Sequence, residues 1–236
     1  MKYQLVRTKN MMLLHGAMEE LIQRMGTSIP CMGLLVGRTG AGKTTAIATV
    51  VAKFNPVTIR AYAAGSLSSL LDSICTELKV DARRVSDKQM VICKALMDSR
   101  RALIVDEADY LTGIPRSLDV LRDIHDTAKV PVILVGMSGL EGRLVHMRQL
   151  TRRISVNVTF EPCDLEDARL VADTLCEVTV EEDLLVHLHT VSRGCIGLLV
   201  VALARVEAHA KEQRHSSIDL KGWGQRQLFL GSEIPE

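Results

Sequence analysis

The octapeptide GRTGAGKT at residues 37–44 limits the possible folds of this chain more than any other feature. It fits the pattern G-x-x-x-x-G-K-[ST], in which a glycine-rich turn presents backbone N–H groups to phosphates at the start of a helix. The context is right, because an apolar run at 31–37 precedes the loop and a helical pattern at 43–54 follows it. Dinucleotide-binding turns lack the Lys-Thr pair, so the motif predicts a nucleoside triphosphate site.

Two side chains of this loop have predicted roles. Lys43 is expected to reach the β and γ phosphates as a point charge, and the Thr44 hydroxyl is placed to bind a magnesium ion. ATP and Mg²⁺ are therefore the predicted cofactors. The other residues expected to surround the nucleotide are Gly37, Arg38, Thr39, Gly40, Ala41, Gly42 and Thr45.

A second apolar run, ALIVDE at 102–107, ends in two carboxylates. Asp106 is expected to bind the magnesium ion, directly or through water. Glu107 stands beside it and is placed to polarise an attacking water, which predicts hydrolysis rather than transfer to a second substrate. The letters DEAD at 106–109 also mark a class of RNA helicases, but those need two tandem nucleotide folds and this chain has room for one. Asp109 has no predicted chemistry beyond a cap or a contact with a neighbouring segment.

The composition favours a buried parallel sheet. Apolar residues make up 47% of the chain and aromatic residues only 3%, so the core must be aliphatic. The formal net charge of +1 means that a polyanion would have to bind local basic patches. Six scattered cysteines without a C-x-x-C pair indicate small core residues in a reducing cytosol. No stretch approaches the roughly 20 apolar residues of a membrane span, so we expect a cytoplasmic protein.

Strand and helix patterns alternate along the first two thirds of the chain. Such alternation predicts an α/β fold, with a mostly parallel sheet and helices on both faces. In the first helix, one apolar face is expected to hold Met12, Leu13, Ala17, Leu21 and Ile22. Ser66 and Ser86 are expected to begin helices. The predicted strands are 31–37, 57–63, 102–107, 130–136 and 154–160, and the helices are 11–25, 43–54, 66–78, 86–99 and 116–128.

Beyond Pro162 the pattern reads as helices only. We therefore expect an α/β nucleotide-binding domain at 1–161, which includes the N-terminal helix, a small helical lid domain at 162–215 and a C-terminal tail at 216–236. The tail holds Trp223, which either anchors another protein or covers the lid.

The order of these elements resembles that of an AAA+ ATPase. A narrower pattern, LIVDEADYL followed by RSLDVLRDIHDTAKVPVILVGMSGLEGRL and RQLTRRISVNVTFEP, looks like the phage Mu B and TnsC-type transposition regulators. The resemblance covers roughly residues 12–210. It implies an ATP-dependent DNA-binding protein that delivers target DNA to a transposase. The implied partners are duplex DNA, further copies of the chain in a head-to-tail filament or ring, and the transposase.

The resemblance also implies roles for residues outside the phosphate loop. An arginine finger, supplied to the next subunit, would be Arg153 or, as second choice, Arg152. The first sensor position falls on Met137, which leaves the neighbouring Ser138 as the polar candidate. The second sensor position falls on Gly197 and Leu198, where Arg193 is the only nearby cation.

DNA contacts are predicted from local charge together with the resemblance. Residues 79–101 are rich in cations, and Arg60 ends the second predicted strand. Phosphate contacts would give affinity without sequence reading. Two alternatives stay open: a helicase loader or replication initiator, and a nucleotide switch that does not bind DNA. The candidate contacts are Arg60, Arg83, Arg84 and Lys88.

Overall fold

The computed structural model describes residues 1–2 and 4–229. They cluster into two compact units, which we describe separately. The core unit comprises Leu13–Arg38 and Lys43–Phe160, and the helical unit comprises Met1–Met12, Thr39–Gly42 and the chain from Glu161 onward. Part of the predicted tail, residues 230–236, lies outside the described residues.

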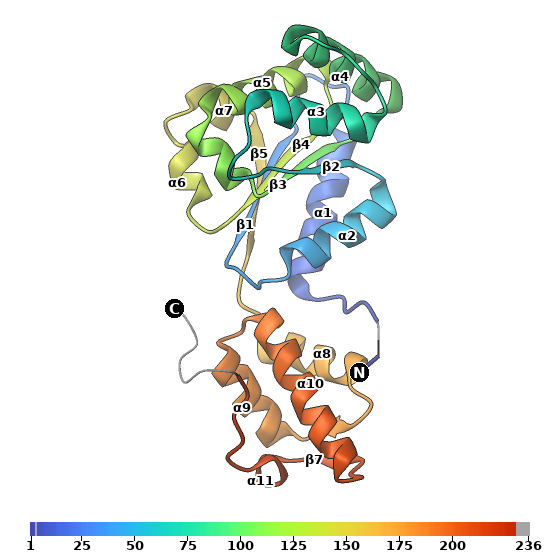
Figure 1. The fold of residues 1–236 in the computed structure, drawn as a ribbon, viewed down its shortest axis with the longest axis vertical. Coiled ribbons are helices and arrows are strands. Elements are labelled where there is room, and N and C mark those ends of the chain that lie inside the picture. Colours follow the sequence, from blue (N-terminus) through green and yellow to red (C-terminus); the bar gives the residue numbers. More distant parts are fainter. Residues whose placement is uncertain (3, 230–236) are drawn as a thin grey trace. The chain divides into compact units, whose positions relative to one another are not determined.

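The core unit is built on a five-stranded parallel sheet with the strand order β2-β3-β4-β1-β5 (Figure 1). Leu35 of β1 pairs with Val135 of β4 on one side and with Val158 of β5 on the other, so β1 is a central strand. The predicted α/β parallel sheet is confirmed. The strands are β1 (Met32–Gly37), β2 (Val57–Arg60), β3 (Leu103–Asp106), β4 (Val132–Gly136) and β5 (Ile154–Phe160).

Helices cover both faces of this sheet (Figure 1). On one face, α3, α4 and α5 bury an aliphatic core against strand residues such as Leu34, Leu103 and Leu134. Each buried aliphatic side chain contributes about 1.5–3 kcal/mol of burial free energy. The helices are α1 (Lys9–Gln23), α2 (Lys43–Phe54), α3 (Leu67–Leu78), α4 (Val85–Ser99), η1 (Ala108–Gly113), α5 (Pro115–Ala128), α6 (Leu140–Leu144) and α7 (Arg148–Thr151).

Two details of the predicted helices are wrong. Leu21 is buried as predicted, but Met12 and Leu13 are more than half exposed, because α1 buries Met11, Leu14 and Met18 instead. Ser66 caps α3 as predicted, in a reciprocal capping box with Ser69. Helix α4, however, begins one residue before Ser86, with Arg84 as its N-cap and no side-chain cap hydrogen bond.

The helical unit also differs from the predicted helices-only pattern, because two short strands, β6 (Thr179–Val180) and β7 (Ser217–Ile218), pair in parallel. Trp223 is only 3% exposed and meets the His209 ring edge-on at 5.8 Å. It therefore covers the helical core, one of its two predicted roles. The helices are α8 (Leu165–Leu175), α9 (Glu182–Ser192), α10 (Ile196–Glu212) and α11 (Leu220–Trp223).

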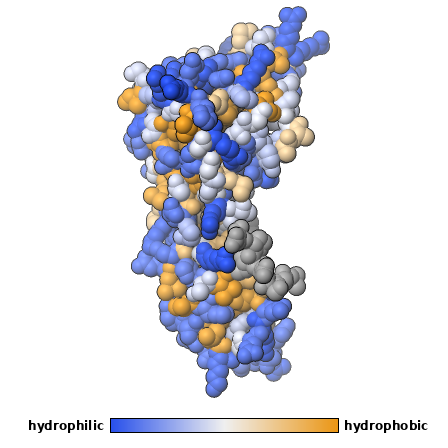
Figure 2. All heavy atoms as spheres, turned by 90° about the vertical axis from the view of Figure 1, so that its left-hand side faces the viewer, coloured by the Kyte–Doolittle hydropathy of each residue, from blue (hydrophilic) through white to orange (hydrophobic). Residues whose placement is uncertain are grey.

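On the face shown in Figure 2, hydrophilic side chains separate small groups of apolar ones. Within the described part of the chain, no helix is long and apolar enough to cross a membrane.

Candidate nucleotide-binding site

The phosphate loop leaves the sheet at the carboxyl end of β1. A Cβ atom on Gly37 would lie 2.7 Å from the Cβ of Phe160 on the neighbouring strand, so only glycine fits there. Gly40 and Gly42 have φ angles of +76° and +86°, which side chains rarely adopt. The motif therefore needs glycine at Gly37 for lack of space, and at Gly40 and Gly42 for their backbone conformation.

Lys43 stands at the first position of α2 and points back along the loop. Its ammonium donates hydrogen bonds to the carbonyl oxygens of Gly37 at 2.5 Å and Arg38 at 3.0 Å. Burial lowers the pKa of Lys43, while the nearby carboxylates of Glu107, Asp106 and Asp109 oppose that shift. The exposed Thr44 follows it in the first turn of the helix.

The carboxylate pair occupies the carboxyl end of β3. Asp106 Oδ1 accepts a hydrogen bond of 2.9 Å from the amide of Glu107, and burial raises the pKa of Asp106. Glu107 adopts a left-handed backbone with φ of 55°, uncommon for a residue with a side chain and a form of local strain that clusters at functional sites. This conformation turns the chain from β3 into η1.

Arg60 reaches this pair from the neighbouring strand. It lies opposite Asp106 in the β2–β3 register, and its Nη2 is 3.0 Å from Oε1 of Glu107. The guanidinium is 61% exposed, so a solvent-facing cation holds the predicted catalytic acid. The sequence offered no signal for this ion pair, because the two residues are far apart along the chain.

Asp109, the last letter of DEAD, has a structural role. Its Oδ2 accepts a hydrogen bond of 2.8 Å from the amide of Met137, and its Oδ1 pairs with Arg143. A Cβ on Gly136 would come within 2.5 Å of Asp109 Oδ2. Asp109 thus ties η1 to the end of β4 at the first sensor position. Ser138 is exposed beside it, and among the described residues its hydroxyl has no hydrogen-bond partner.

Within the helical unit, Thr39–Gly42 lie against the start of α10. The amide of Gly197 donates to the carbonyl of Gly40 at 3.0 Å, and Cys195 Sγ is 3.6 Å from the same oxygen. At the predicted second sensor position, the loop is therefore contacted by backbone rather than by a side-chain cation. Arg193 is exposed and ends α9 in a left-handed conformation.

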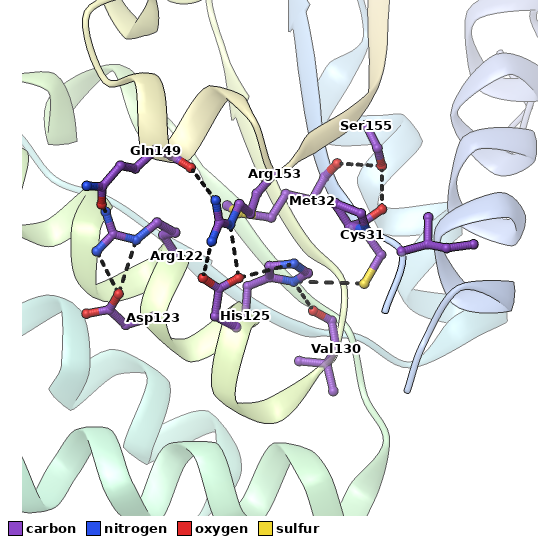
Figure 3. Close-up of polar contacts among 12 residues, drawn as sticks. Cys31, Met32, Arg122, Asp123, His125, Val130, Gln149, Arg153 and Ser155 are labelled. Carbon is purple, nitrogen blue, oxygen red and sulfur yellow. Dashed lines mark hydrogen bonds and ion pairs between the residues drawn. The ribbon is translucent and has the colours of Figure 1, made fainter. Parts of the chain in front are cut away.

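The two finger candidates have different surroundings. Arg153 donates to both carboxylate oxygens of Asp126, at 3.3 and 3.0 Å, and its Nη1 lies 3.5 Å from the carbonyl of Gln149 (Figure 3). Arg152 is exposed, and its side chain has no ion pair or hydrogen bond within the described residues. Arg152 is the cation that is free to reach another molecule.

The residues predicted to contact DNA also differ in their exposure. Arg83 and Arg84 are exposed in the turn before α4. Lys88 is buried between α3 and α4, where its Nζ lies 2.5 Å from Asp72 Oδ1 and 3.3 Å from Ser68 Oγ. These contacts argue against the predicted DNA contact of Lys88, because its charge is used inside the helix pair. The sequence showed only a cation in a basic segment.

Together, the parallel sheet, the phosphate loop and the carboxylates at the end of β3 have the arrangement of the P-loop AAA+ fold. Residues 30–144 match the family model described as "AAA domain". No protein with a curated function matches the sequence. The resemblance to Mu B and TnsC-type regulators therefore stays a prediction.

Three solved structures are similar over most of the chain. The Aeropyrum pernix ORC1 protein in complex with DNA is 19% identical with a TM-score of 0.64, over 94% of this chain and 64% of that one. Cdc6p from Pyrobaculum aerophilum is 15% identical with a TM-score of 0.64, over 90% of this chain and 64% of that one. The A. pernix ORC2 protein with ADPNP and ADP is 14% identical with a TM-score of 0.67, over 92% and 68%. The chain thus spans about two thirds of these relatives, or slightly less, and at these identities the likeness shows the fold.

Proposed function

We propose that this protein is an ATPase that binds duplex DNA in its ATP-bound form, assembles head-to-tail, and acts as a replication initiator or helicase loader. The observation that carries the proposal is the full phosphate loop together with the carboxylate pair that ends β3. The DNA part is supported by likeness to initiator-type structures, one of which is described in complex with DNA.

The residues fit a magnesium nucleotide. The Thr44 hydroxyl and the Asp106 carboxylate are hard oxygen ligands of the kind magnesium prefers. Asp106 uses Oδ1 for the Glu107 amide, while Oδ2 has no hydrogen-bond partner among the described residues. When bound, the ion neutralises charge on the phosphates. Lys43 holds the β and γ phosphates, and Glu107 takes the proton of the attacking water.

Arg60 couples DNA to hydrolysis in this proposal. Glu107 must leave its ion pair with Arg60 before it can orient water, and a DNA phosphate would compete for the same exposed guanidinium. Arg60→Gln should therefore raise the ATPase rate without DNA and abolish stimulation by DNA. Arg116→Gln, a change of an exposed arginine at the start of α5, is the matched control. A variant that is still stimulated by DNA as strongly as wild type contradicts the coupling.

Head-to-tail assembly would place Arg152 near the phosphates of the next subunit. An arginine finger contributes about 10³ to 10⁵ in rate in other nucleotidases. Mixing Lys43→Ala subunits, which supply a finger but bind no ATP, with Arg152→Ala subunits, which bind ATP but lack a finger, should restore hydrolysis. In a second mixture, Arg153→Ala subunits replace the Arg152→Ala subunits, and the two recovered ATPase rates are compared. No recovery in the first mixture contradicts the assignment to Arg152.

The second candidate function is regulation of transposition by delivery of target DNA to a transposase. The segment from Leu118 to Leu140 resembles the Mu B and TnsC-type regulators, and this resemblance favours the transposition role. Electron microscopy of the protein with duplex DNA and a non-hydrolysable ATP analogue separates the candidates. Long filaments along DNA favour the transposition role, and short closed assemblies favour the initiator role. Monomers that fail to retain DNA under these conditions leave only a nucleotide switch without DNA.

A further inference from the structure

A polar cavity lies at the amino-terminal edge of the core sheet, away from the phosphate loop. Its volume is about 270 Å³, slightly below the usual range for sites that hold drug-sized molecules. It opens beside the start of β1, and the loop begins at the other end of that strand, roughly 16 Å away at the usual rise per residue. The side chains that matter here are Ser28, Cys31, His125, Asp126, Lys129 and Arg153.

His125 presents an unused acceptor to this cavity. The residue is 4% exposed, and its Nδ1 donates to the carbonyl of Val130 at 2.9 Å (Figure 3). Burial lowers the pKa of His125, so the ring is neutral and Nε2 carries a lone pair. The nearest acidic oxygen, Oδ1 of Asp126, lies 3.8 Å from Nε2, beyond hydrogen-bond distance.

A cysteine–histidine nucleophile does not explain the arrangement. Cys31 Sγ lies 3.8 Å from Nδ1 of His125, but that nitrogen donates its proton to Val130 and cannot accept another. Burial raises the pKa of Cys31 to about 11, which keeps the thiol protonated. The cavity therefore holds no activated cysteine nucleophile.

Two cations complete the chemistry of the cavity. The Lys129 side chain forms no ion pair or hydrogen bond within the described residues, and Arg153 has one acidic partner, Asp126. Lys129 and Arg153 can bind anionic oxygens, while Nε2 of His125 requires a hydrogen-bond donor, since Arg153 already donates to both oxygens of Asp126. A ligand must offer negative charge and a proton on neighbouring atoms.

We propose that this cavity binds a protonated phosphate group, either inorganic phosphate or the phosphate of a small monoester. Such a group carries P–O⁻ oxygens for Lys129 and Arg153 and a P–OH for Nε2 of His125. Sulfate has the same shape and is fully deprotonated at neutral pH, so it leaves the buried acceptor unpaired. The cavity should therefore select phosphate over sulfate. This inference does not depend on ATP hydrolysis or on DNA binding.

The test follows the His125 imidazole signal by NMR in the full chain, with a non-hydrolysable ATP analogue filling the phosphate loop. Inorganic phosphate, glycerol 3-phosphate and sulfate are titrated separately. We expect the His125 signal to shift and to saturate as phosphate or glycerol 3-phosphate is added. The compound that binds more tightly shows whether the site takes free phosphate or a phosphate monoester. Sulfate should bind about tenfold more weakly or worse. The proposal is overturned if neither phosphate nor glycerol 3-phosphate shifts the His125 signal, or if sulfate binds as tightly as they do.

Lys129→Gln provides a second test with a closely matched control. Lys129 caps α5 with φ of 55°, and Lys79 caps α3 with φ of 56°; both are exposed. Lys129→Gln should weaken phosphate binding about tenfold, and Lys79→Gln should leave it unchanged. Equal affinity in the two variants contradicts the site, and because both positions are exposed, loss of folding does not confuse the result.

Discussion

Two acids, the buried Glu207 of the helical unit and the half-buried Asp106 of the core unit, have opposite surroundings. In the helical unit, Glu207 is 2% exposed and accepts from Lys211 Nζ at 2.6 Å and from the amide of Glu177 at 3.3 Å. Burial by itself raises the pKa of Glu207, but these partners lower it overall. In the core unit, the Glu107 amide is the only group among the described residues that donates a hydrogen bond to the Asp106 carboxylate, because Lys43 donates to backbone carbonyls instead. Burial leaves the pKa of Asp106 raised.

The comparison separates an acid whose oxygens are satisfied by the chain from one that keeps an unpaired oxygen. Buried polar groups are normally satisfied by their own chain, and a group that is not satisfied retains binding capacity for a ligand. The DEAD quartet shows both cases within four residues. Asp109 is fully engaged by Met137 and Arg143, whereas Oδ2 of Asp106 has no hydrogen-bond partner among the described residues. Glu107 lies between these cases, because its one side-chain partner is the exposed Arg60.

The largest effect is expected at the catalytic acid. Glu107→Gln should lower the ATPase rate by about 100-fold or more, because the amide cannot accept the proton of water, while ATP affinity stays near wild type. Rate and affinity are measured by phosphate release and by fluorescent-nucleotide titration. Glu182→Gln is the control, because Glu182 pairs with Arg169 in the helical unit. Hydrolysis at the normal rate in Glu107→Gln refutes its role.

A smaller effect, on stability, is expected at the satisfied acid. Glu207→Gln should lower the free energy of unfolding by about 2 kcal/mol, since hydrogen bonds to a charged group are lost. Trp223 is the only tryptophan and is buried in the helical unit, so its fluorescence reports unfolding of that unit.

The stabilising effect of Glu207 should depend on pH. Because the folded pKa of Glu207 lies below its ordinary 4.5, its contribution is present above pH 4.5 and is lost as pH falls through the folded value. The stability gap between wild type and Glu207→Gln should therefore narrow below pH 4.5. A gap that is constant with pH would mean that the charge of Glu207 does not stabilise the unit.

Lys88 extends the comparison to a cation. Lys88→Gln should destabilise the core unit by about 1–2 kcal/mol through loss of its buried contact with Asp72, measured by circular dichroism during urea unfolding. DNA affinity should not change. The Arg83→Gln/Arg84→Gln double variant should show the reverse, with weaker DNA binding and unchanged stability. A loss of DNA affinity in folded Lys88→Gln would restore Lys88 as a contact.

The smallest effect is expected at the unsatisfied acid, and its sign is opposite. The folded pKa of Asp106 is raised, so its favourable contribution exists below pH 3.8 and is lost as pH rises through the folded value. Asp106→Asn should therefore raise the melting temperature slightly at pH 7 without nucleotide. With magnesium and ATP, the variant should lose the thermal stabilisation that wild type gains. A lower melting temperature without nucleotide would show that Asp106 stabilises the fold.

Contiguous patterns were predicted well, and contacts between distant residues were not. The phosphate loop, all five strands and the Ser66 cap depend on neighbours in sequence. The buried side of α1 was partly misplaced, because Leu13 and Leu14 are both apolar and only tertiary packing selects between them. The Arg60–Glu107 and Asp126–Arg153 pairs join residues from separate elements, and no local pattern announces them.

By itself, the sequence determined that this chain forms a nucleotide-binding α/β fold, because glycine spacing, apolar runs and strand-terminal acids specify local conformation directly. Only the tertiary structure decided which charges remain available. It paired Lys88 with Asp72, engaged Asp109 with Arg143, held Arg153 against Asp126 and left Arg152 exposed. The physical reason is that a charge acts through whatever lies within a few ångströms of it, and the folded chain sets those neighbours.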